Sequence, residues 1–525
     1  MSPVFREPEA SSRPPRPRRG PALLTALLLL AIGCGSDLPA AGPGVRPPAV
    51  AGSFYPDDAG MLRRAIRFYL DDAEGGSVEG VRVIVAPHAG YVYSGQIAAD
   101  AWARAAREEA DVVFILGTNH TVAPFREVSV WHAGAYRTPL GDALVDEGIA
   151  RELMNSDPRF VFRPDAHERE HSVEVQVPFV QVLFPGAKIV PLVVGAPDPE
   201  LCEALGRAIA RLAGGRRAVI AASSDLSHYP EWEDAVRVDG AVLRAVAEGD
   251  RATVVRVMEE ELRRGAPGLS TCACGEGPVL AALAAAEALG LPSAEVVSYA
   301  NSGDTALGDR KRVVGYGAVA FGATGGKDPL AGLRRPEPEL SERDFDEEER
   351  RWLLAHARRA VVQYLTSGTA PLARPEGAGL WRRQGAFVTL EIGDRLRGCI
   401  GHMAENRPLC QVVGAMALQA AFNDRRFSPL TAKELGEIRV EISVLTPKRR
   451  VSGPEDIVIG RDGVVLEKDG RSAVYLPQVA PEEGWNREEM LGHLARKAGL
   501  PADAWRRGAA LWTFRAEVFG EGEVH

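Results

Sequence analysis

The stretch VRVIVAPHAGY (81–91) decides the fold. It opens with an apolar run that only Arg82 interrupts, and His88 lies two residues after the run ends. The same kind of run recurs three times, as VVFILG (112–117), IVPLVVG (189–195) and AVIAA (218–222). Continuous Val/Ile/Leu runs that alternate with helical segments are typical of buried parallel strands. The first part of the chain is therefore predicted to be an α/β domain with a mostly parallel central sheet.

Polar groups follow three of these four runs. His88 follows the first, His120 follows 112–117, and the third is continued by Ser223-Ser224-Asp225-Leu226-Ser227-His228, whereas 189–195 ends in glycine. Ligands of such sheets bind at the carboxyl ends of the strands. We therefore expect His88, His120, Asp225 and His228 to converge on one crevice, which predicts a metal-dependent site.

Composition sets the broad class of protein. A chain of 525 residues with 46% hydrophobic and 25% charged residues is ordinary globular material for two or three domains. The net charge of −9 gives no reason to expect nucleic acid as a partner. Six cysteines are too few for a disulfide scaffold.

The N-terminus has the pattern of a signal peptide (1–34). Several arginines precede the apolar run ALLTALLLLAI (22–32), and Gly33-Cys34 follow it. The run is too short to span a bilayer as a mature helix. The segment resembles a lipobox, so we expect a lipoprotein of the cell envelope, anchored by lipid on Cys34. Simple secretion, an uncleaved anchor or a mis-assigned start are the alternatives.

The rest of the chain divides by composition. A Gly/Pro-rich tether (35–48) leads to a first domain (49–323), which a linker (324–344) joins to a second domain (345–525). The expected elements of the second domain are listed here: a helix over 347–365, a β-hairpin from 386–392 and 396–401 with a turn at Gly393-Asp394, a strand over 439–447 and a helix over 487–500.

Two histidines and a cysteine make the predicted metal site. His88 and His120 would supply imidazole, which suits iron, copper and zinc, and Cys274 would supply thiolate. Cys274 precedes the helical stretch 277–290, and a helix N-terminus is expected to lower the pKa of a thiol. Cys272 can add a second sulfur ligand, or it can form a disulfide with Cys274 that would defeat the site. On these residues alone iron, copper and zinc all stay open.

Three further residues are candidates for acid–base work. Asp225 and His228 can orient the ligands or act as general acid and base, and Glu170-His171 can join them. The segment AHEREHSVEVQVPF (166–179) can equally be a charged surface loop that leads into a helix.

The first domain resembles the Memo family, system protein B of the AmmeMemoRadiSam set. The resemblance rests on seven motifs in order: AGSFYP (51–56), APHAGYVYSG (86–95), ILGTNH (115–120), YRTPLG (136–141), EHSVEVQVPF (170–179), SSDLSH (223–228) and CGEGP (274–278). It implies a fold similar to that of LigB-type class III extradiol dioxygenases, which hold non-haem iron with two histidines and a glutamate. By resemblance His88 and His120 are the imidazole ligands, and Cys274 replaces the glutamate, which makes copper a competitor to iron.

Arginines and a cysteine gather in the second domain. Arg397 and Cys399 lie in LRGCIG (396–401), and Arg425 and Arg426 lie in NDRRFSP (423–429). Guanidinium groups match phosphate and carboxylate, so this set can form an anion or partner site beside a reactive thiol. Pairing of the arginines with Asp424 or Glu441, around a simply buried Cys399, explains the same residues and is the favoured interpretation.

The second domain resembles the AMMECR-type domain, system protein A of the same set. The resemblance rests on RGCIG (397–401), NDRRFSPL (423–430), EISVLTP (441–447) and LPQVAPEEGWNREEML (476–491). An α+β domain is expected. The fusion implies a radical SAM partner, and that chemistry must lie in another polypeptide because the chain has no Cys-x₃-Cys-x₂-Cys run.

Four functions remain in view. The first is a metal-dependent oxidoreductase in the Memo-like domain, acting on an unknown small molecule. The second is an iron- or copper-binding lipoprotein without turnover. The third is a zinc hydrolase with Asp225 or His228 as base. The fourth is an adaptor that presents its arginine loop to the radical SAM partner.

Overall fold

The computed structural model describes residues 44–326, 328–334 and 344–522. The predictions of a signal peptide and of lipid on Cys34, most of the tether and about half of the linker lie outside these residues. Within the described residues, no helix is both long and apolar enough to cross a membrane.

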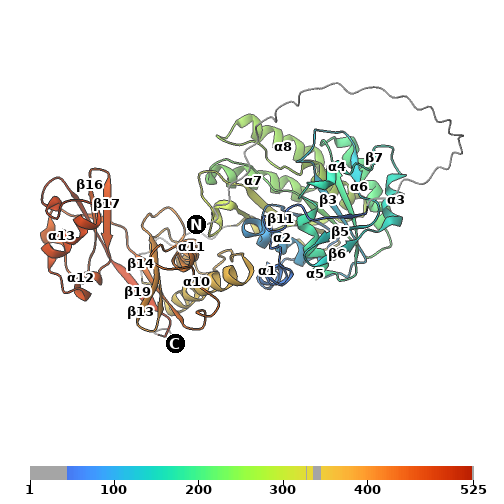
Figure 1. Ribbon diagram of the computed structural model, residues 1–525. Helices are drawn as coiled ribbons and strands as arrows, with labels where there is room; N and C mark the ends of the chain where they lie inside the picture. Colours follow the sequence, from blue (N-terminus) through green and yellow to red (C-terminus); the bar gives the residue numbers. More distant parts are fainter. Residues whose placement is uncertain (1–43, 327, 335–343, 523–525) are drawn as a thin grey trace, which may run out of the picture. The chain divides into compact units, whose positions relative to one another are not determined.

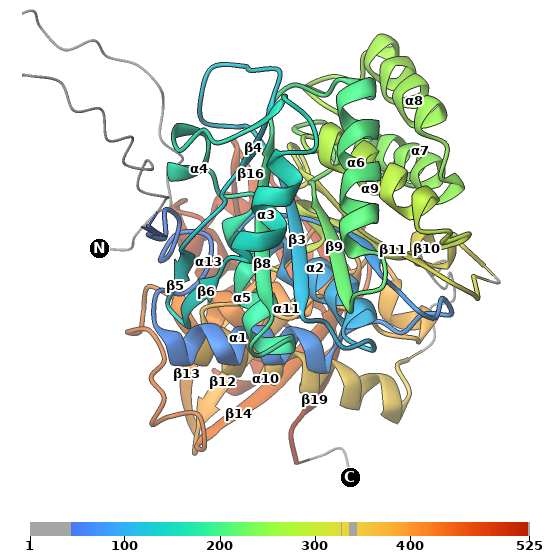
Figure 2. The same cartoon turned by 90° about the vertical axis from the view of Figure 1, so that its right-hand side faces the viewer.

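The four apolar runs form the centre of one sheet. They are β2 (Val83–Ala86), β9 (Ala218–Ser223), β3 (Val112–Thr118) and β8 (Lys188–Val194). They lie side by side in the order β2-β9-β3-β8, and every neighbouring pair is parallel. Figure 2 shows β8, β3 and β9 running together. The predicted mostly parallel sheet is confirmed, and all four strands are almost wholly buried, as continuous apolar runs require.

Four shorter or antiparallel strands complete this sheet in the order β10-β11-β2-β9-β3-β8-β4-β7. They are β10 (Ser293–Asn301), β11 (Gly315–Gly322), β4 (Val128–Val130) and β7 (Phe160–Val161). The strand-like run at the end of the first domain is β11, which pairs antiparallel with β2. A separate small sheet contains β1 (Val45–Arg46), β5 (Ala135–Thr138) and β6 (Gly141–Leu144).

Helices cover the large sheet. The helix α2 (Tyr91–Ala105) packs on β2, β10 and β11, and α9 (Glu276–Ala288) packs on β2, β3 and β9. The helix α6 (Pro199–Ala213) packs closely on α9, where a Cβ on Gly206 would lie 2.3 Å from the Ala281 carbonyl oxygen. The remaining helices are α1 (Ala59–Asp71), α3 (Glu147–Met154), α4 (Asp165–Glu168), α5 (Val177–Leu183), α7 (Trp232–Glu248) and α8 (Arg251–Arg264).

The second half is α+β with two antiparallel sheets (Figure 1). The first sheet has the order β13-β12-β14-β19, from β12 (Ala386–Ile392), β13 (Arg395–His402), β14 (Ile438–Leu445) and β19 (Ala516–Gly520). One face packs on α10 (Glu347–Ser367) and α11 (Leu409–Phe422). The predicted hairpin, strand and first helix are confirmed, and β12 and β13 pair antiparallel from Ala386↔His402 to Ile392↔Arg395.

The second sheet has a smaller core of its own. Its order is β15-β18-β16-β17, from β15 (Arg449–Arg450), β16 (Gly463–Lys468), β17 (Arg471–Tyr475) and β18 (Ala510–Phe514). The helices α12 (Val479–Glu482) and α13 (Arg487–Lys497) accompany it, and α13 confirms the helix predicted over 487–500. Leu466, Leu491 and Leu494 lie in this core.

Candidate metal centre

Three imidazoles meet at the carboxyl ends of the central strands. The ring centroids of His88 and His120 lie 5.2 Å apart, those of His88 and His171 5.4 Å, and those of His120 and His171 4.7 Å. One ring nitrogen of each lies within 4.8 Å of those of the other two. His88 and His120 each follow their strand by two residues, and β9 lies between those strands. The topology therefore brings together residues that are 32 positions apart in sequence.

Cys274 and Asp225 form a second group that shares His88. The Cys274 sulfur lies 3.1 Å from His88 Nε2, and the ligand atoms of the three residues lie within 4.8 Å of one another. The turn that carries Cys274 is held against the end of β9, where a Cβ on Gly275 would lie 2.4 Å from the Ser223 carbonyl oxygen. Cys272 and Cys274 are both free, and the Cys272 sulfur instead contacts the Met258 carbonyl at 3.6 Å.

Hydrogen bonds fix which nitrogen of His88 carries the proton. Ser223 Oγ donates its one proton to the Ser172 carbonyl at 2.6 Å, and it accepts from Gln176 Nε2 at 2.9 Å. It also lies 3.0 Å from His88 Nδ1. Because the hydroxyl proton is already used, His88 Nδ1 must donate to Ser223. The neutral ring then presents the lone pair of Nε2 toward Cys274, as a metal ligand requires.

Glu170 orients His120 in a comparable way. Its carboxylate accepts from His120 Nδ1 at 2.9 Å and from the His120 backbone N–H at 2.7 Å. These contacts, together with His171, outweigh burial and hold the pKa of Glu170 at about 2. Burial lowers the pKa of His120, but Glu170 and Asp225 outweigh it and the net shift is upward. In the neutral ring, Nδ1 carries the proton and Nε2 is available as a ligand atom.

Ser172 locks the two segments of this pair together. Its hydroxyl donates to the Thr118 carbonyl at 3.1 Å and accepts from the Thr118 N–H at 3.0 Å. Ser172 can come this close to β3 only because residue 117 is glycine: a Cβ there would lie 2.4 Å from Ser172 Oγ. The interpretation of 166–179 as a mere surface loop is therefore wrong for residues 170–176, which are mostly buried and hold the end of β3.

His171 is the ligand candidate that sequence reasoning did not propose. It was considered there as an acid–base group, yet the structure groups its ring with the other two imidazoles. Phe54 packs against it with ring centroids 4.8 Å apart. Burial lowers the pKa of His171 to about 4, so the ring is neutral near pH 7. The clue in the sequence was the pair Glu170-His171, in which one residue orients His120 and the next lies beside it.

Burial shifts the pKa values of Asp225 and His228, beside the cluster, in opposite directions. Asp225 accepts from the backbone N–H groups of His88 at 2.7 Å and Ala89 at 3.2 Å, but burial outweighs these bonds and raises its pKa to about 6. Burial, with smaller effects of His120 and His171, lowers the pKa of His228 to about 4. His228 Nε2 is buried and has no hydrogen-bond partner among the described residues.

The thiol pKa differs from the sequence expectation. Cys274 immediately precedes Gly275, the N-cap of α9, but burial, and after it the Asp225 carboxylate, raises the pKa of Cys274 well above its usual value. The prediction of a lowered pKa is wrong for the site without metal, because desolvation outweighs the helix N-terminus. A bound cation would supply the missing positive charge and release the thiol proton.

The donor set fits a metal cation. It combines three imidazoles, the thiol of Cys274, and the carboxyl groups of Asp225 and Glu170. No lysine or arginine forms an ion pair with Asp225 or Glu170 in the part of the chain that the structure describes. The site also opens to solvent, because the side chains of His120 and His171 are 26% and 19% exposed. Nitrogen and sulfur donors together suit iron, copper and zinc.

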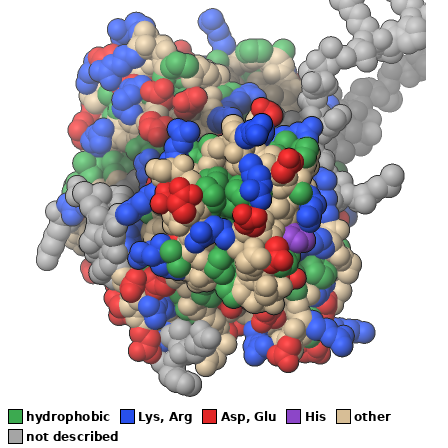
Figure 3. Space-filling model, turned by 90° about the vertical axis from the view of Figure 1, so that its left-hand side faces the viewer, with side chains coloured by type: hydrophobic (Ala, Val, Ile, Leu, Met, Phe, Trp, Pro, Cys, Tyr) green, Lys and Arg blue, Asp and Glu red, His purple; other side chains and the backbone are tan. Residues whose placement is uncertain are grey.

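The arginines of the second half are largely paired. Arg397 Nε donates to Glu434 at 2.7 Å, and Arg426 Nη2 donates to Asp424 at 2.7 Å. The pairing with Asp424 was expected from sequence, whereas the pairing with Glu434 was not. Arg425 is exposed, and Cys399 is half-buried rather than fully buried. Figure 3 shows basic and acidic side chains interspersed on one face of the molecule, so the described part of this face is not uniformly basic.

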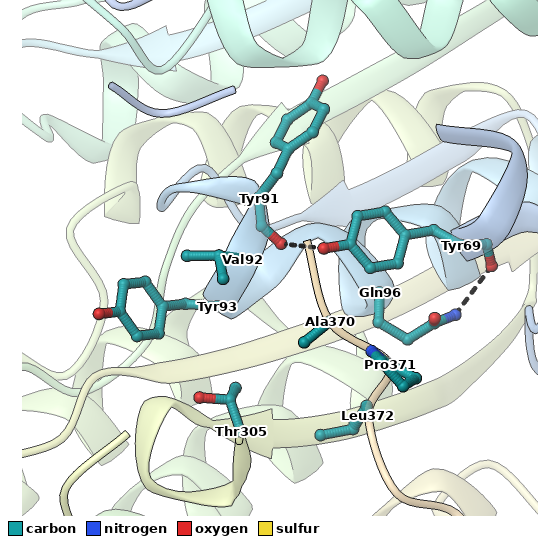
Figure 4. A pocket seen from close by; sticks show the side chains of 9 residues that line it. All are labelled: Tyr69, Tyr91, Val92, Tyr93, Gln96, Thr305, Ala370, Pro371 and Leu372. Atoms are coloured by element: carbon teal, nitrogen blue, oxygen red, sulfur yellow. Dashed lines mark hydrogen bonds between the residues drawn. The ribbon is translucent and has the colours of Figure 1, made fainter. Parts of the chain in front are cut away.

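None of the residues that line the pocket drawn in Figure 4 is a histidine. Its walls include Tyr69, Gln96 and Leu372, and the Tyr69 hydroxyl donates to the Tyr91 carbonyl at 2.6 Å. Its volume is about 10 Å³, enough for about one water molecule. The Tyr91 ring points away from this pocket, and its hydroxyl donates to the Val175 carbonyl at 2.7 Å. This pocket is too small for a substrate.

Fold and site together define an α/β protein with a candidate metal centre at the carboxyl edge of a mostly parallel sheet. The family model described as Memo-like protein matches residues 46–320, and the AMMECR1 family model matches residues 354–519. The chain therefore belongs to the Memo family, and its second half is an AMMECR1 domain.

Two MEMO1 family proteins agree with the assignment of the first half. A MEMO1 family protein of Sulfolobus acidocaldarius is 39% identical over 293 residues, which cover 53% of this chain and 99% of the relative. A MEMO1 family protein of Metallosphaera sedula is 36% identical over 289 residues, with coverage of 53% and 99%. The crystal structure of an uncharacterised protein from Pyrococcus horikoshii is 36% identical, with a TM-score of 0.33, and covers 34% of this chain and 95% of its own.

Proposed function

We propose that the Memo-like half is a metal-dependent oxidoreductase, in which His88, His120 and Cys274 hold iron or copper and His171 supports them. The observation that carries the proposal is that two groups of ligand atoms share His88: the three imidazoles of His88, His120 and His171, and His88 with Asp225 and Cys274. A bound iron or copper would supply one-electron chemistry at this edge of the sheet. Zinc remains the less favoured occupant.

The residues around the metal ligands have separate tasks. Ser223 and Glu170 orient His88 and His120 by accepting from their Nδ1–H groups. A carboxyl with a pKa of about 6 changes its protonation state near neutral pH, so Asp225 can take or give a proton. His228 is neutral, and its unpartnered Nε2 can accept a hydrogen bond from a substrate group.

Solvent access favours catalysis over storage. A closed set of protein ligands is typical of structural sites, whereas catalytic sites keep a position open. The partial exposure of His120 and His171 leaves such an approach. The alternative of a non-catalytic iron- or copper-binding lipoprotein would need the same ligands but no substrate access. Attachment at Cys34 and cooperation with a radical SAM partner are further parts of the proposal, which rest on the sequence alone.

Metal analysis of the full chain, purified anaerobically, tests the ligands. Cys274→Ser is expected to lose most of the bound iron or copper, whereas Cys272→Ser, two residues away, keeps it because its sulfur faces Met258. Equal metal content in both variants, with unchanged circular dichroism, would contradict the thiol ligand. If the wild-type chain takes up neither iron nor copper, the oxidoreductase proposal fails as a whole.

A further inference from the structure

Arg46 binds the backbone of the segment that contains Glu170 and His171. It lies in β1 and is 1% exposed. Its Nε donates to the His167 carbonyl at 3.0 Å, and its Nη2 donates to the Glu170 carbonyl at 2.6 Å. Its Nη1 pairs with the Glu174 carboxylate. A guanidinium is a planar fork with fixed donor directions, so Arg46 sets the relative positions of the three groups that it contacts.

Glu174 binds back to the chain around Arg46. Its carboxylate accepts from the Ala49 N–H at 2.8 Å, from the Val50 N–H at 3.0 Å and from the Tyr55 hydroxyl at 2.5 Å. Glu174 is 0% exposed, and among the described residues Arg46 is the one cation that forms an ion pair with it. A buried carboxylate is costly unless it is paired and hydrogen-bonded. These contacts therefore fasten the two segments to each other, and Arg46 supplies the positive charge that they need.

The segment that follows Arg46 also covers His171. The Phe54 ring packs on His171 with centroids 4.8 Å apart, and the Phe54 carbonyl accepts from the Tyr91 N–H at 2.7 Å. Tyr91 begins α2 and follows His88 by three residues. Phe54 therefore contacts both the ring of one ligand candidate and the backbone close to another.

Glu170 connects Arg46 to the imidazoles. Its carboxylate accepts from His120 Nδ1 and from the His171 N–H, each at 2.9 Å. Its carbonyl is bound by the Arg46 guanidinium. Removing a group that orients a metal ligand commonly weakens metal binding, even though no ligand atom is lost. The guanidinium therefore acts on two ligand candidates through one residue that contacts both.

We propose that Arg46 is a positioning residue of the metal centre and acts through Glu170 and His171. Its fork fixes the Glu170 backbone so that the carboxylate faces His120, and its buried ion pair keeps the segment that follows it packed on the His171 ring. The inference rests on the proposed metal function, and it extends the metal centre to a residue 124 positions before Glu170. Removing Arg46 is expected to loosen the imidazole cluster without removing any ligand atom.

Carbethoxylation of His171 tests the position of its ring in the metal-free full chain. Diethylpyrocarbonate modifies accessible neutral imidazoles, and peptide mass spectrometry gives the rate at His171, whose side chain is 19% exposed. Arg46→Met is expected to raise this rate several-fold, because the segment that covers the ring is released. Arg46→Lys keeps a charge beside Glu174 but lacks the fork that reaches both carbonyls, so a smaller rise is expected. An unchanged rate in both variants would overturn the proposal.

Arg104→Met is the matched control for the loss of a buried cation. Arg104 is also 1% exposed, and it pairs with Glu295 and donates to the Val78 carbonyl, neither of which belongs to the metal centre. This variant is expected to destabilise the fold and to leave the His171 rate at the wild-type value. Cys202, which is 0% exposed, stays unreactive toward iodoacetamide in a variant that remains folded. An equal rise in Arg104→Met would mean that general loosening exposes His171, and the proposal would be wrong.

Metal affinity in a double-variant series tests the step from position to binding. Chelator competition with iron and copper is expected to show about tenfold weaker binding in Arg46→Met. The same change in the His171→Asn chain is expected to have a much smaller effect, because the ring that Arg46 positions is absent. Equal effects in the two chains would refute the positioning role, since Arg46 would then act on stability alone. If the wild-type chain binds neither metal, the proposed function fails, and the carbethoxylation rates still decide whether Arg46 positions His171.

Discussion

Cys274 and Cys399 lie in different surroundings. Cys274 lies where strand ends converge, 3.1 Å from His88 Nε2, and burial and the Asp225 carboxyl raise its pKa. Cys399 is half-buried on a sheet face, where Thr389 Oγ1 donates to its sulfur at 3.4 Å and Asp424 neutralises the nearby Arg426. The first cysteine lies among groups that bind cations, whereas the charged residues around the second already pair with one another. The neighbours of a cysteine, rather than the cysteine itself, therefore indicate whether it can belong to a metal site.

The largest expected effect is the loss of His88. His88 belongs to both ligand groups, so His88→Asn is expected to reduce bound iron or copper to background, whereas His171→Asn removes only part of it. Elemental analysis of the two purified variants measures how much metal each one retains. The control is His132→Asn, because His132 is a partly exposed histidine that belongs to neither ligand group. If His171→Asn loses more metal than His88→Asn, the shared role of His88 is wrong.

The next effect is on the orientation of His120. Glu170→Gln replaces the carboxylate that accepts from His120 Nδ1, and it is expected to weaken metal binding by roughly 10- to 100-fold. A chelator competition titration measures the affinity, and exposed Glu168→Gln serves as the control. An affinity within twofold of the wild type would show that Glu170 does not position the ligand.

The smallest effect is expected in the second half, at the Arg397–Glu434 pair. Arg397 lowers the pKa of Glu434 to about 2, so the pair stabilises the fold above about pH 4.5, and the gain is lost as the pH falls toward 2. Glu434 is 26% exposed, and solvent screening limits the gain to less than about 1 kcal/mol.

Urea unfolding of Arg397→Gln, beside Arg395→Gln on the same strand, checks this value at pH 7 and pH 4. The difference between Arg397→Gln and the wild type should shrink at the lower pH. If Arg397→Gln lowered the free energy of unfolding by more than about 3 kcal/mol at pH 7, the pair would behave as a buried ion pair. Glu434 would then resemble the buried Glu170 rather than a solvent-screened carboxylate.

Much of the first half could be predicted because the pattern is local. Four apolar runs indicated four parallel strands, and the rule for strand ends placed His88, His120 and Asp225 together. The tautomer of His88 could not be predicted, because it depends on a hydroxyl from β9 and a carbonyl of residue 172. The pKa of Cys274 was predicted in the wrong direction because burial is a property of the assembled site.

The sequence by itself determined the elements and the family: the strand runs, the hairpin around RGCIG, and the Memo and AMMECR1 motifs are all written in consecutive residues. Only the tertiary structure decided which groups meet. It brought His171 to the two predicted imidazoles, brought Cys274 and Asp225 to His88, and paired Arg397 with Glu434. The physical reason is that a side chain's charge state and partners depend on the desolvation and distances that packing creates, and these have no period along the chain.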